Sequence, residues 1–449
     1  MITIPEKCRF IFEKLENAGF ECYAVGGCVR DSIMGITPKD WDFTTNATPD
    51  EITEVFCDYK LVDIGKKFGT ICVIVSEETF EITTYRIERG YSDNRHPDTV
   101  LFSSMINDDL SRRDFTMNSI AFSEKYGIVD PFGGVEDIHN RVIRCTGEPS
   151  LRFSEDALRI LRAIRFASVL GFNIEKTTSE ALFMCKDNLT SVNPNRMQKE
   201  LTSLLCGMNV QSVLSNYAPV LSVIIPEIEP MLECVQNNPH HKYDVWNHTL
   251  KAMSLSEPDE RIRLALFFHD SGKPFVKTTD DNGIDHFKKH QIKSAEIASD
   301  VLKRFCYSSS LINDVVCLVR YHDERFYKMG ESIKNLISII GEQLIYTVIY
   351  ISQCDILAQS NYKQEYKLSH LDNVKKETDR IISMGECYSL SQLSLNGDDL
   401  KAVGFVGKEI GTALESVLKK VIKGKLSNEK TQLLQYVYDN KQMLLTIDK

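Results

Sequence analysis

The first part of the chain mixes helix-like and strand-like patterns of apolar residues. Apolar positions recur at helical spacing over residues 10–18, and residues 21–25 then predict a short strand. Residues 29–34 predict a second helix. Residues 70–75 and 79–84 are rich in β-branched residues and predict two adjacent strands separated by a polar turn. This alternation predicts an α/β arrangement of helices and strands.

The pattern changes farther along. The Thr48-Pro49-Asp50-Glu51 stretch has the form of a capping box with proline at the first helical position, which predicts a helix start. From about Ser154 onward, apolar residues recur at three- and four-residue spacing, which predicts helices almost throughout. We therefore expect an α+β fold with a small mixed sheet at the N-terminal end and helices elsewhere.

Composition is that of an ordinary globular protein, with 43% hydrophobic and 26% charged residues. The chain has no run of about 18 apolar residues, which argues against a membrane protein, and residues 1–8 lack the pattern of a secretory signal. The 13 cysteines include no Cys-x-x-Cys pair and lie mostly in apolar stretches, as reduced core residues do. We expect a cytoplasmic protein without a membrane partner, a disulfide framework or a zinc ribbon.

The net charge of −10, taken alone, argues against a large nucleic-acid partner, because phosphate contacts need Lys and Arg. Arginine is nonetheless concentrated: 11 of the 20 lie between Arg86 and Arg165, in a window that also holds 13 Asp and Glu. The planar guanidinium fork suits bidentate contacts with phosphates and base edges. Surface salt bridges are the alternative interpretation of this window.

Three carboxylates are candidates for catalysis. Asp40 and Asp42 are two residues apart, so on a strand both side chains would point to the same face. Two carboxylates this close repel each other unless a cation lies between them, and oxygen ligands favour Mg²⁺. Glu81, between apolar neighbours that face the other way, is the candidate third carboxylate. The set predicts a displacement at a phosphate, in which metal ions activate a hydroxyl and neutralise the leaving pyrophosphate.

The segment before these carboxylates predicts a phosphate-binding turn. Gly26 and Gly27 lie between a predicted strand and a predicted helix, where backbone N–H groups and a helix N-terminus can meet a triphosphate. Arg30 would add a cation. A tight turn with a structural role only is the alternative.

These residues resemble the opening motif of class II tRNA nucleotidyltransferases and bacterial poly(A) polymerases, within the DNA polymerase β-like superfamily. Further segments follow in the family's order: residues 112–119 resemble its ribose-binding motif, residues 130–147 its hinge-like motif, and residues 155–167 its fourth motif. Ser119 departs from the usual Ala. The resemblance implies nucleotide-binding roles for Gly26, Gly27, Arg30, Arg113, Asp114, Asn118, Glu155, Asp156, Arg159 and Arg162.

The fourth motif also has a physical interpretation of its own. On a continuous helix Glu155, Asp156 and Arg159 would share one face. An Asp beside an Arg offers the acceptor and the donors that the edges of cytosine and adenine require. In the resembled family this motif selects CTP and then ATP without a nucleic-acid template. A ladder of surface ion pairs is the alternative.

The loop that follows Glu81 bears on the choice within the family. Residues 86–102 resemble the Arg-x-Glu-x-x-Tyr-x-Asp-x-Arg-His-Pro signature of CCA-adding enzymes, in which the loop acts as a lever in the switch from C to A. This loop argues against an enzyme that adds only CC, and it leaves an A-adding enzyme and a poly(A) polymerase as alternative functions. For the loop itself, the alternative is a surface loop with no lever role. Arg196 and Glu200 fall where the family has its fifth motif, and Glu200 predicts a brace between helices.

A second constellation of histidines and aspartates lies between residues 240 and 360. A His-Asp pair at the end of an apolar helix is costly to bury without a cation, and the order of the segments resembles the HD phosphohydrolase superfamily. Ser271 departs from that pattern beside the ligands. The resemblance implies a metal set of His248, His269, Asp270 and Asp355, with His290 and His322 at the positions that complete two-metal versions.

Imidazole with carboxylate suits a divalent transition metal, whose bound water would attack a phosphoester. An HD fold with a structural role only is the alternative. The sequence thus predicts a nucleotidyltransferase head (1–145), a helical neck (146–236), an HD domain (237–385) and a helical tail (386–449). In the tail, candidate tRNA contacts are Lys419, Lys420, Lys423 and Lys425, for which a solvated lysine face is the alternative.

The predicted function is template-independent addition of C, C and A from CTP and ATP to the 3′ end of tRNA, with Mg²⁺ held by Asp40 and Asp42 and a second, HD-type phosphohydrolase activity. An HD phosphohydrolase with an RNA-binding N-terminal half is the alternative from another class. The sequence leaves the oligomeric state open.

Overall fold

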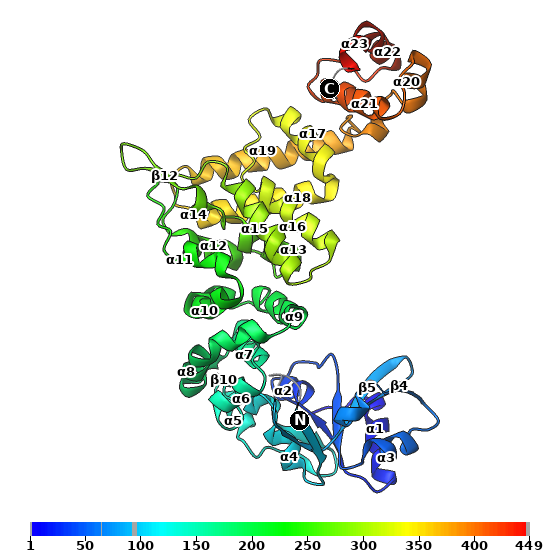
Figure 1. Ribbon diagram of the computed structural model, residues 1–449, viewed down its shortest axis with the longest axis vertical. Helices are drawn as coiled ribbons and strands as arrows, with labels where there is room; N and C mark the ends of the chain where they lie inside the picture. Colours follow the sequence, from blue (N-terminus) through cyan, green and yellow to red (C-terminus); the bar gives the residue numbers. More distant parts are fainter. Residues whose placement is uncertain (1, 64, 92–96, 446–449) are drawn as a thin grey trace. The chain divides into compact units, whose positions relative to one another are not determined.

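The structure, a computed structural model, describes residues 2–63, 65–91 and 97–445. The chain forms two compact units, Met1–Pro226 and Glu227–Lys449. Among the described residues, the first unit carries one large sheet with helices, and the second is helical apart from one short two-stranded pair (Figure 1). The predicted α+β class is confirmed, and the division into four domains stays a prediction.

The large sheet is mixed and has seven strands in the order β3-β4-β5-β2-β1-β8-β9. Its neighbouring strands are antiparallel except for β2 and β5, which run parallel. The strands are β1 (Cys22–Val25), β2 (Asp42–Thr45), β3 (Lys60–Val62), β4 (Thr70–Val75), β5 (Glu78–Thr84), β8 (Ala121–Ser123) and β9 (Gly127–Val129). The strands predicted over 70–75 and 79–84 therefore lie where the sequence placed them.

Alternation along β5 separates the core from the site. Phe80 and Ile82 are buried, whereas Glu81 between them is exposed. The ring of Phe43 on β2 packs edge to face against Phe80 and against Phe12 of α1 (Glu6–Asn17), with centroids 6.1 and 5.3 Å apart. The apolar side of the two strands is thus fixed in the core, and the polar residues at alternate positions face outward.

Short helices complete the head. The capping box predicted at Thr48 is present and begins α3 (Pro49–Val55). The second predicted helix begins two residues early, as α2 (Gly27–Ile33), because Gly26 turns the chain at φ +81° directly after β1. The remaining elements are α4 (Ile106–Ser111), α5 (Gly134–His139) and the ribbon of β6 (Arg86–Arg89) with β7 (Thr99–Phe102).

The predicted lever loop is described only in part. Asp93, Arg95 and His96 of its signature lie outside the described residues. The rest of the first unit is helical, apart from a two-residue pair of β10 (Val142–Ile143) with β11 (Asn173–Ile174). Its helices are α6 (Pro149–Glu155), α7 (Leu158–Leu170), α8 (Lys176–Cys185), α9 (Pro194–Leu205) and α10 (Val210–Ile224).

The second unit is built from helices that bury apolar faces against one another. Its first part contains α11 (Glu229–Leu232), α12 (Val245–Ser254), α13 (Glu260–Phe268), α14 (Lys273–Val276), α15 (His290–Arg304), α16 (Ser309–Tyr321), α17 (Met329–Ile340), α18 (Glu342–Ala358) and α19 (Gln364–Ser383). A pair of two-residue strands, β12 (Thr278–Thr279) and β13 (Asp285–His286), precedes α15. Figure 1 shows these helices stacked side by side.

The C-terminal helices share a core of their own. Leu400, Phe405, Val417 and Leu433 are buried in one apolar cluster there. The cluster is formed by α20 (Gly397–Val403), α21 (Lys408–Ile422), α22 (Lys430–Asp439) and α23 (Lys441–Leu444).

No single described helix is long and apolar enough to cross a membrane. Only α17 and α18 taken together meet that test of length and composition, and they are bent by 117° at the break between them.

Candidate functional site

The register of the large sheet brings two of the three candidate carboxylates side by side. Asp42 on β2 lies directly opposite Glu81 on β5 in the parallel pair, and both side chains are exposed. The pKa of Asp42 is raised by the protein packed around its carboxyl group and by the nearby Glu81 and Asp40 charges, while Arg113 opposes the shift. The three carboxylates therefore form one like-charged group, which is a favourable setting for a cation.

The placement of Asp40 differs from the expectation. The strand begins at Asp42, so Asp40 lies in the loop that precedes it. Trp41 is buried between the two exposed aspartates. The prediction of two aspartates on one strand was wrong, although Asp40 still lies near enough to raise the pKa of Asp42.

The glycine turn connects β1 to α2 as predicted. Gly26 adopts φ +81°, a conformation that L-residues rarely adopt, and an added Cβ would lie 3.1 Å from Nη1 of Arg113. Arg30 is buried and points inward: its Nη1 donates to Oδ1 of Asn118 at 2.8 Å, and its Nη2 pairs with Asp31 at 2.7 Å. Arg30 thus ties the turn to the second motif, and Arg113 is the arginine that lies over the turn.

A chain of ion pairs runs from the second motif to the fifth. Oδ2 of Asp114 accepts from Nε of Arg162 at 2.8 Å, and its Oδ1 accepts from Nδ2 of Asn118 at 3.1 Å. Glu200 on α9 in turn binds Arg162 at 3.3 Å and Arg165 at 2.8 Å. Burial opposes ionisation of Asp114, but Arg162 and the Asn118 hydrogen bond lower its pKa to about 2. Asp114 is therefore a fixed anion held between helices.

The fourth motif lies on two helices. The helix α6 ends at Glu155, Asp156 has extended backbone angles of φ −144° and ψ 102°, and α7 begins at Leu158. The expectation of a continuous helix with all three side chains on one face was wrong, because the Asp156 carboxylate bonds locally to the N–H of Leu158 at 3.1 Å.

The arginine of this motif still meets Glu155. Nη1 of Arg159 pairs with Oε2 of Glu155 at 2.7 Å, and its Nη2 donates to the backbone oxygen of Arg112 at 3.1 Å. Asp156 instead receives both arms of Arg196, at 2.7 and 3.2 Å. Arg196 was expected only as part of the fifth motif, and nothing in its spacing along the chain indicated Asp156 as its partner.

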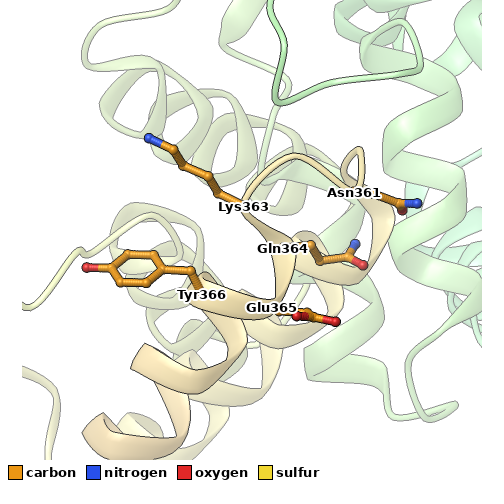
Figure 2. A pocket seen from close by; sticks show the side chains of 5 residues that line it. All are labelled: Asn361, Lys363, Gln364, Glu365 and Tyr366. Atoms are coloured by element: carbon orange, nitrogen blue, oxygen red, sulfur yellow. The ribbon is translucent and has the colours of Figure 1, made fainter.

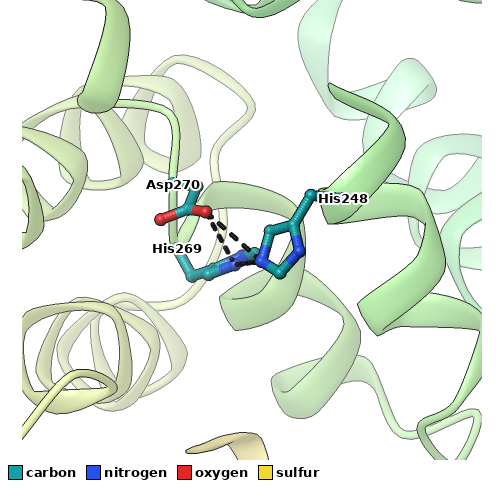
Figure 3. A group of neighbouring side chains, drawn as sticks. All are labelled: His248, His269 and Asp270. Carbon is teal, nitrogen blue, oxygen red and sulfur yellow. Dashed lines mark hydrogen bonds and ion pairs between the residues drawn. The ribbon is translucent and has the colours of Figure 1, made fainter. Parts of the chain in front are cut away.

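The second unit collects histidines and aspartates at the ends of several helices. His248 on α12 lies with His269 and Asp270, which follow α13, in one buried group (Figure 3). Nε2 of His269 lies 3.4 Å from Nε2 of His248, and Oδ2 of Asp270 lies 3.3 and 3.5 Å from these two nitrogens. Figure 3 shows the three side chains pointing toward one another.

Asp270 is shared with a second buried group. Its Oδ1 lies 3.3 Å from Nε2 of His290 and 3.9 Å from Nε2 of His322, and those two nitrogens are 3.3 Å apart. Asp355 on α18 completes the first group, with its Oδ1 at 2.7 Å from Nε2 of His248. All six predicted residues of this centre are therefore brought together.

The ring orientations are set by backbone carbonyls one turn earlier. Nδ1 of His269 donates to the oxygen of Leu266 at 2.6 Å, and Nδ1 of His322 to that of Val319 at 2.7 Å. His290 makes the same bond at 2.9 Å. A carbonyl only accepts, so Nδ1 of each of these three rings carries a proton, and in the neutral form of such a ring Nε2 is the atom that can bind a metal. Burial lowers the pKa of His322 to about 3, which keeps its ring in the neutral, ligating form.

Polar residues that the sequence did not single out surround this centre. Lys273 is buried and pairs with Oδ2 of Asp270 at 2.7 Å and with Gln236 at 2.8 Å. Gln359 donates to Oδ2 of Asp355 at 2.9 Å. Each is three or four residues from its partner aspartate on the chain, and this helical spacing is the signal that could have indicated them.

A surface pocket at the start of α19 lies apart from the predicted residues. It is lined by Asn361, Lys363, Gln364, Glu365 and Tyr366 (Figure 2). None of the predicted site residues lines it. Lys419, Lys423 and Lys425 are exposed at the end of α21 and beyond it.

Three family models match this chain. The poly A polymerase head domain matches residues 22–144, which include the glycine turn and the three carboxylates. The RNA and SrmB-binding site of polymerase A matches residues 171–231, and tRNA nucleotidyltransferase domain 2 matches residues 289–437.

Relatives and solved structures agree with these matches. A Staphylococcus aureus protein named CCA-adding enzyme is 38% identical over 324 residues, which cover 67% of this chain and 78% of the relative. The crystal structure of the Bacillus stearothermophilus CCA-adding enzyme in complex with CTP aligns with a TM-score of 0.70 and 25% identity, over 97% of this chain and 96% of that one. The Thermotoga maritima CCA-adding enzyme complexed with tRNA shares the fold, with a TM-score of 0.57 and 23% identity over 98% of this chain and 97% of its own.

Proposed function

We propose that this chain, which belongs to the family of CCA-adding enzymes, adds C, C and A from CTP and ATP to the 3′ end of tRNA with release of pyrophosphate. Its class is nucleotidyltransferase, as in its relatives. The observation that carries the proposal is the pairing of Asp42 with Glu81 on parallel strands, close to Arg113 and Asp40. A family member needs such a cluster to hold metal at the reacting phosphate.

The three carboxylates fit Mg²⁺. The pKa of Asp42 is raised by the protein packed around its carboxyl group and by the nearby Glu81 and Asp40 charges, and a bound cation would offset both effects. We assign Asp40 and Asp42 as metal ligands and Glu81 as the third carboxylate. The metal would supply charge neutralisation at the triphosphate and activation of the tRNA 3′ hydroxyl.

The chain's own residues would hold the nucleotide on the other side. The Gly26 turn offers backbone N–H groups without a side chain in the way, and Arg113 lies 3.1 Å from the position that a Cβ would take there. Asp114 and Asn118, fixed by Arg162 and Arg30, are positioned as hydrogen-bonding partners for a ribose. These contacts recognise the triphosphate and sugar, which all nucleotides share.

Base selection requires different groups. Asp156 and Arg159 provide the acceptor and donors that cytosine and adenine edges need. In the structure each is engaged by a protein partner, Arg196 and Glu155 respectively. We propose that the incoming base replaces part of these contacts, so that Glu155 and Arg196 orient the two reading side chains.

The decisive experiment separates full CCA addition from the narrower alternatives. CTP and ATP are offered to tRNAs that end before CCA, after C and after CC. A CCA-adding enzyme completes all three. Incorporation of A onto the CC-ended tRNA alone identifies an A-adding enzyme, and long A tails on any RNA identify a poly(A) polymerase.

We also propose that the His/Asp centre of the second unit binds a divalent transition metal and hydrolyses a phosphoester. Two pairs of buried Nε2 atoms lie 3.4 and 3.3 Å apart, the Asp270 carboxylate lies against both pairs, and the Asp355 carboxylate lies 2.7 Å from Nε2 of His248. Imidazole nitrogens and carboxylates gathered this closely favour a cation. The metal would supply a bound water as nucleophile.

A direct test is metal analysis of the purified protein followed by an assay on a 2′,3′-cyclic phosphate. Bound metal with hydrolysis supports the second activity, and bound metal without hydrolysis supports a structural centre. Absence of both after incubation with Mn²⁺, Ni²⁺ and Zn²⁺ contradicts the metal assignment.

We further propose that the protein acts in the cytoplasm. All 13 cysteines are free in the structure, and most are wholly or partly buried, in keeping with a reducing compartment.

A further inference from the structure

Asp109 on α4 is a fully buried carboxylate that joins two arginines. It is 0% exposed. Its Oδ1 accepts from Nε and Nη2 of Arg112 at 2.9 and 2.6 Å, and its Oδ2 accepts from Nη2 of Arg113 at 3.1 Å. Burial alone would raise the pKa of Asp109, but the two guanidinium groups hold it below its usual value. A buried anion persists only with such partners, and both of its oxygens are used.

The Arg112 arm leads to the predicted lever loop and to base selection. Nη1 of Arg112 donates to Oε1 of Glu88 on β6 at 3.1 Å, and Oε2 of Glu88 accepts from the hydroxyl of Tyr91 at 2.6 Å. The backbone oxygen of Arg112 also accepts from Nη2 of Arg159 at 3.1 Å. Arg112 thus contacts the stem of the loop and the arginine that we assign to reading the base.

The Arg113 arm leads to the triphosphate side. Nη1 of Arg113 lies over the Gly26 turn, and the charge of Arg113 acts on Asp42. The second oxygen of Asp109 also accepts from the hydroxyl of Thr44 at 3.2 Å, two residues after Asp42 on β2. The Asp109 carboxylate therefore contacts Thr44 on the strand that carries Asp42, Arg113 over the turn, and Arg112, which contacts Arg159.

We propose that Asp109 is a positioning residue that aligns Arg113 with the triphosphate and Arg112 with Arg159, so that base selection and phosphate placement share one buried anchor. The proposal rests on the function proposed above. To hold both arginines, the side chain at position 109 needs two acceptor oxygens, one for Arg112 and one for Arg113. An asparagine has the same shape but offers one oxygen, and its amide donors would face the other guanidinium group.

The test is Asp109→Asn with Asp108→Asn as the matched control. Asp108 lies on the same helix and is only partly buried, and it bonds to Ser103 rather than to either arginine. On a tRNA that ends before CCA, kcat and KM are measured separately for CTP and for ATP. In Asp109→Asn we expect kcat/KM for CTP to fall about 10- to 100-fold and the preference for CTP over ATP to fall about tenfold. Asp108→Asn should keep both values within about twofold.

The selection ratio distinguishes positioning from general damage. A folded Asp109→Asn protein that loses rate equally for CTP and ATP, or that behaves like Asp108→Asn, overturns the inference while leaving the proposed function standing. Failure of the unaltered chain to add either nucleotide overturns the proposed function, and the inference with it.

Two further variants separate the arms and serve if Asp109→Asn does not fold. Arg112→Lys keeps a cation beside Asp109, but lysine lacks the second donor arm that reaches Glu88. We expect this variant to have a lower preference for CTP over ATP and an unchanged kcat for CTP. Arg113→Lys should lower kcat with the preference retained. Indistinguishable effects of the two variants on both values overturn the inference.

Discussion

At the scale of the residue, Asp42 is the group on which nucleotide addition should depend most directly. It pairs with Glu81 in the sheet, and its pKa is raised by the protein packed around it and by the negative charges nearby. Asp42→Asn removes one metal ligand without changing the size of the side chain. Several kcal/mol of metal stabilisation of the transition state would be lost, so addition should fall by about 10³-fold or more.

The measurement is single-turnover incorporation of labelled CTP. The control is Asp58→Asn, since Asp58 is an exposed head residue outside the carboxylate group. Hydrolysis of a 2′,3′-cyclic phosphate at the second centre should be unchanged in Asp42→Asn, because its six residues lie in the other compact unit. Normal addition by Asp42→Asn would contradict the assignment of the metal site.

Asp114 gives a prediction about pH. Its pKa falls from 3.8 to about 2 on folding, so the folded state binds its proton less readily than the unfolded chain does. The stabilisation that its charge contributes is therefore complete above about pH 4 and is lost as the pH falls toward 2. A shift of this size corresponds to about 2 kcal/mol.

Urea unfolding of the unaltered chain and of Asp114→Asn, measured between pH 6 and pH 2.5, tests this. The unaltered chain should be more stable at pH 6 by about 2 kcal/mol. The difference should shrink as the pH falls below about 4. A difference that stays constant over this range would show that the stabilisation does not come from the charge.

At the scale of the element, the break between α6 and α7 is the feature that arranges the fourth motif. The helix stops at Glu155 because Asp156 takes an extended conformation and its carboxylate binds the N–H of Leu158. Asp156 can then reach Arg196 on α9. This contact joins the break before α7 to α9, and Glu200, which binds Arg162 and Arg165, joins α7 itself to α9.

Glu200→Gln tests that fastening. The amide keeps one acceptor but loses the charge, so the partly buried Arg162 and Arg165 each lose the anion that Glu200 provides. We therefore expect the free energy of unfolding to fall by about 1–3 kcal/mol. Since Arg162 also holds Asp114, the KM for CTP should rise as well. Unfolding by urea and steady-state kinetics measure the two effects.

The control is Glu180→Gln on α8. Glu180 is an exposed carboxylate that lies 3.9 Å from Nζ of Lys176, and such surface pairs contribute little. Equal losses of stability in the two variants would contradict a bracing role for Glu200.

At the scale of the whole molecule, the two compact units separate nucleotide addition from the second metal centre. If the His/Asp centre binds metal only when folded, Mn²⁺ or Ni²⁺ should stabilise the second unit by mass action. At a concentration about 100 times the Kd, the expected shift is about 5–10 °C in its unfolding midpoint. EDTA should reverse it.

Calorimetry of the unaltered chain, His269→Ala and His286→Ala provides the comparison. His269 belongs to the buried centre, whereas His286 is partly exposed and pairs with Asp280 outside it. The metal-dependent shift should vanish in His269→Ala and persist in His286→Ala. A shift that survives in His269→Ala would place the stabilising metal elsewhere.

The sequence by itself determined many of the local elements and indicated the candidate reacting groups. The β-branched residues on either side of a polar turn indicated β4 and β5, and the capping box indicated the start of α3. The ordered motifs also indicated the family that the comparisons show. These signals are local, so they can be found without knowing where the chain returns.

Only the tertiary structure decided which of these groups meet. The chain leaves Asp40 off the strand, breaks the helix at Asp156 and brings Arg196 to it, and none of these contacts follows from spacing. Both oxygens of the buried Asp109 are likewise used by neighbouring arginines. The physical reason is that burial forces charged groups to find partners, and the packing of helices and strands selects those partners from anywhere in the unit.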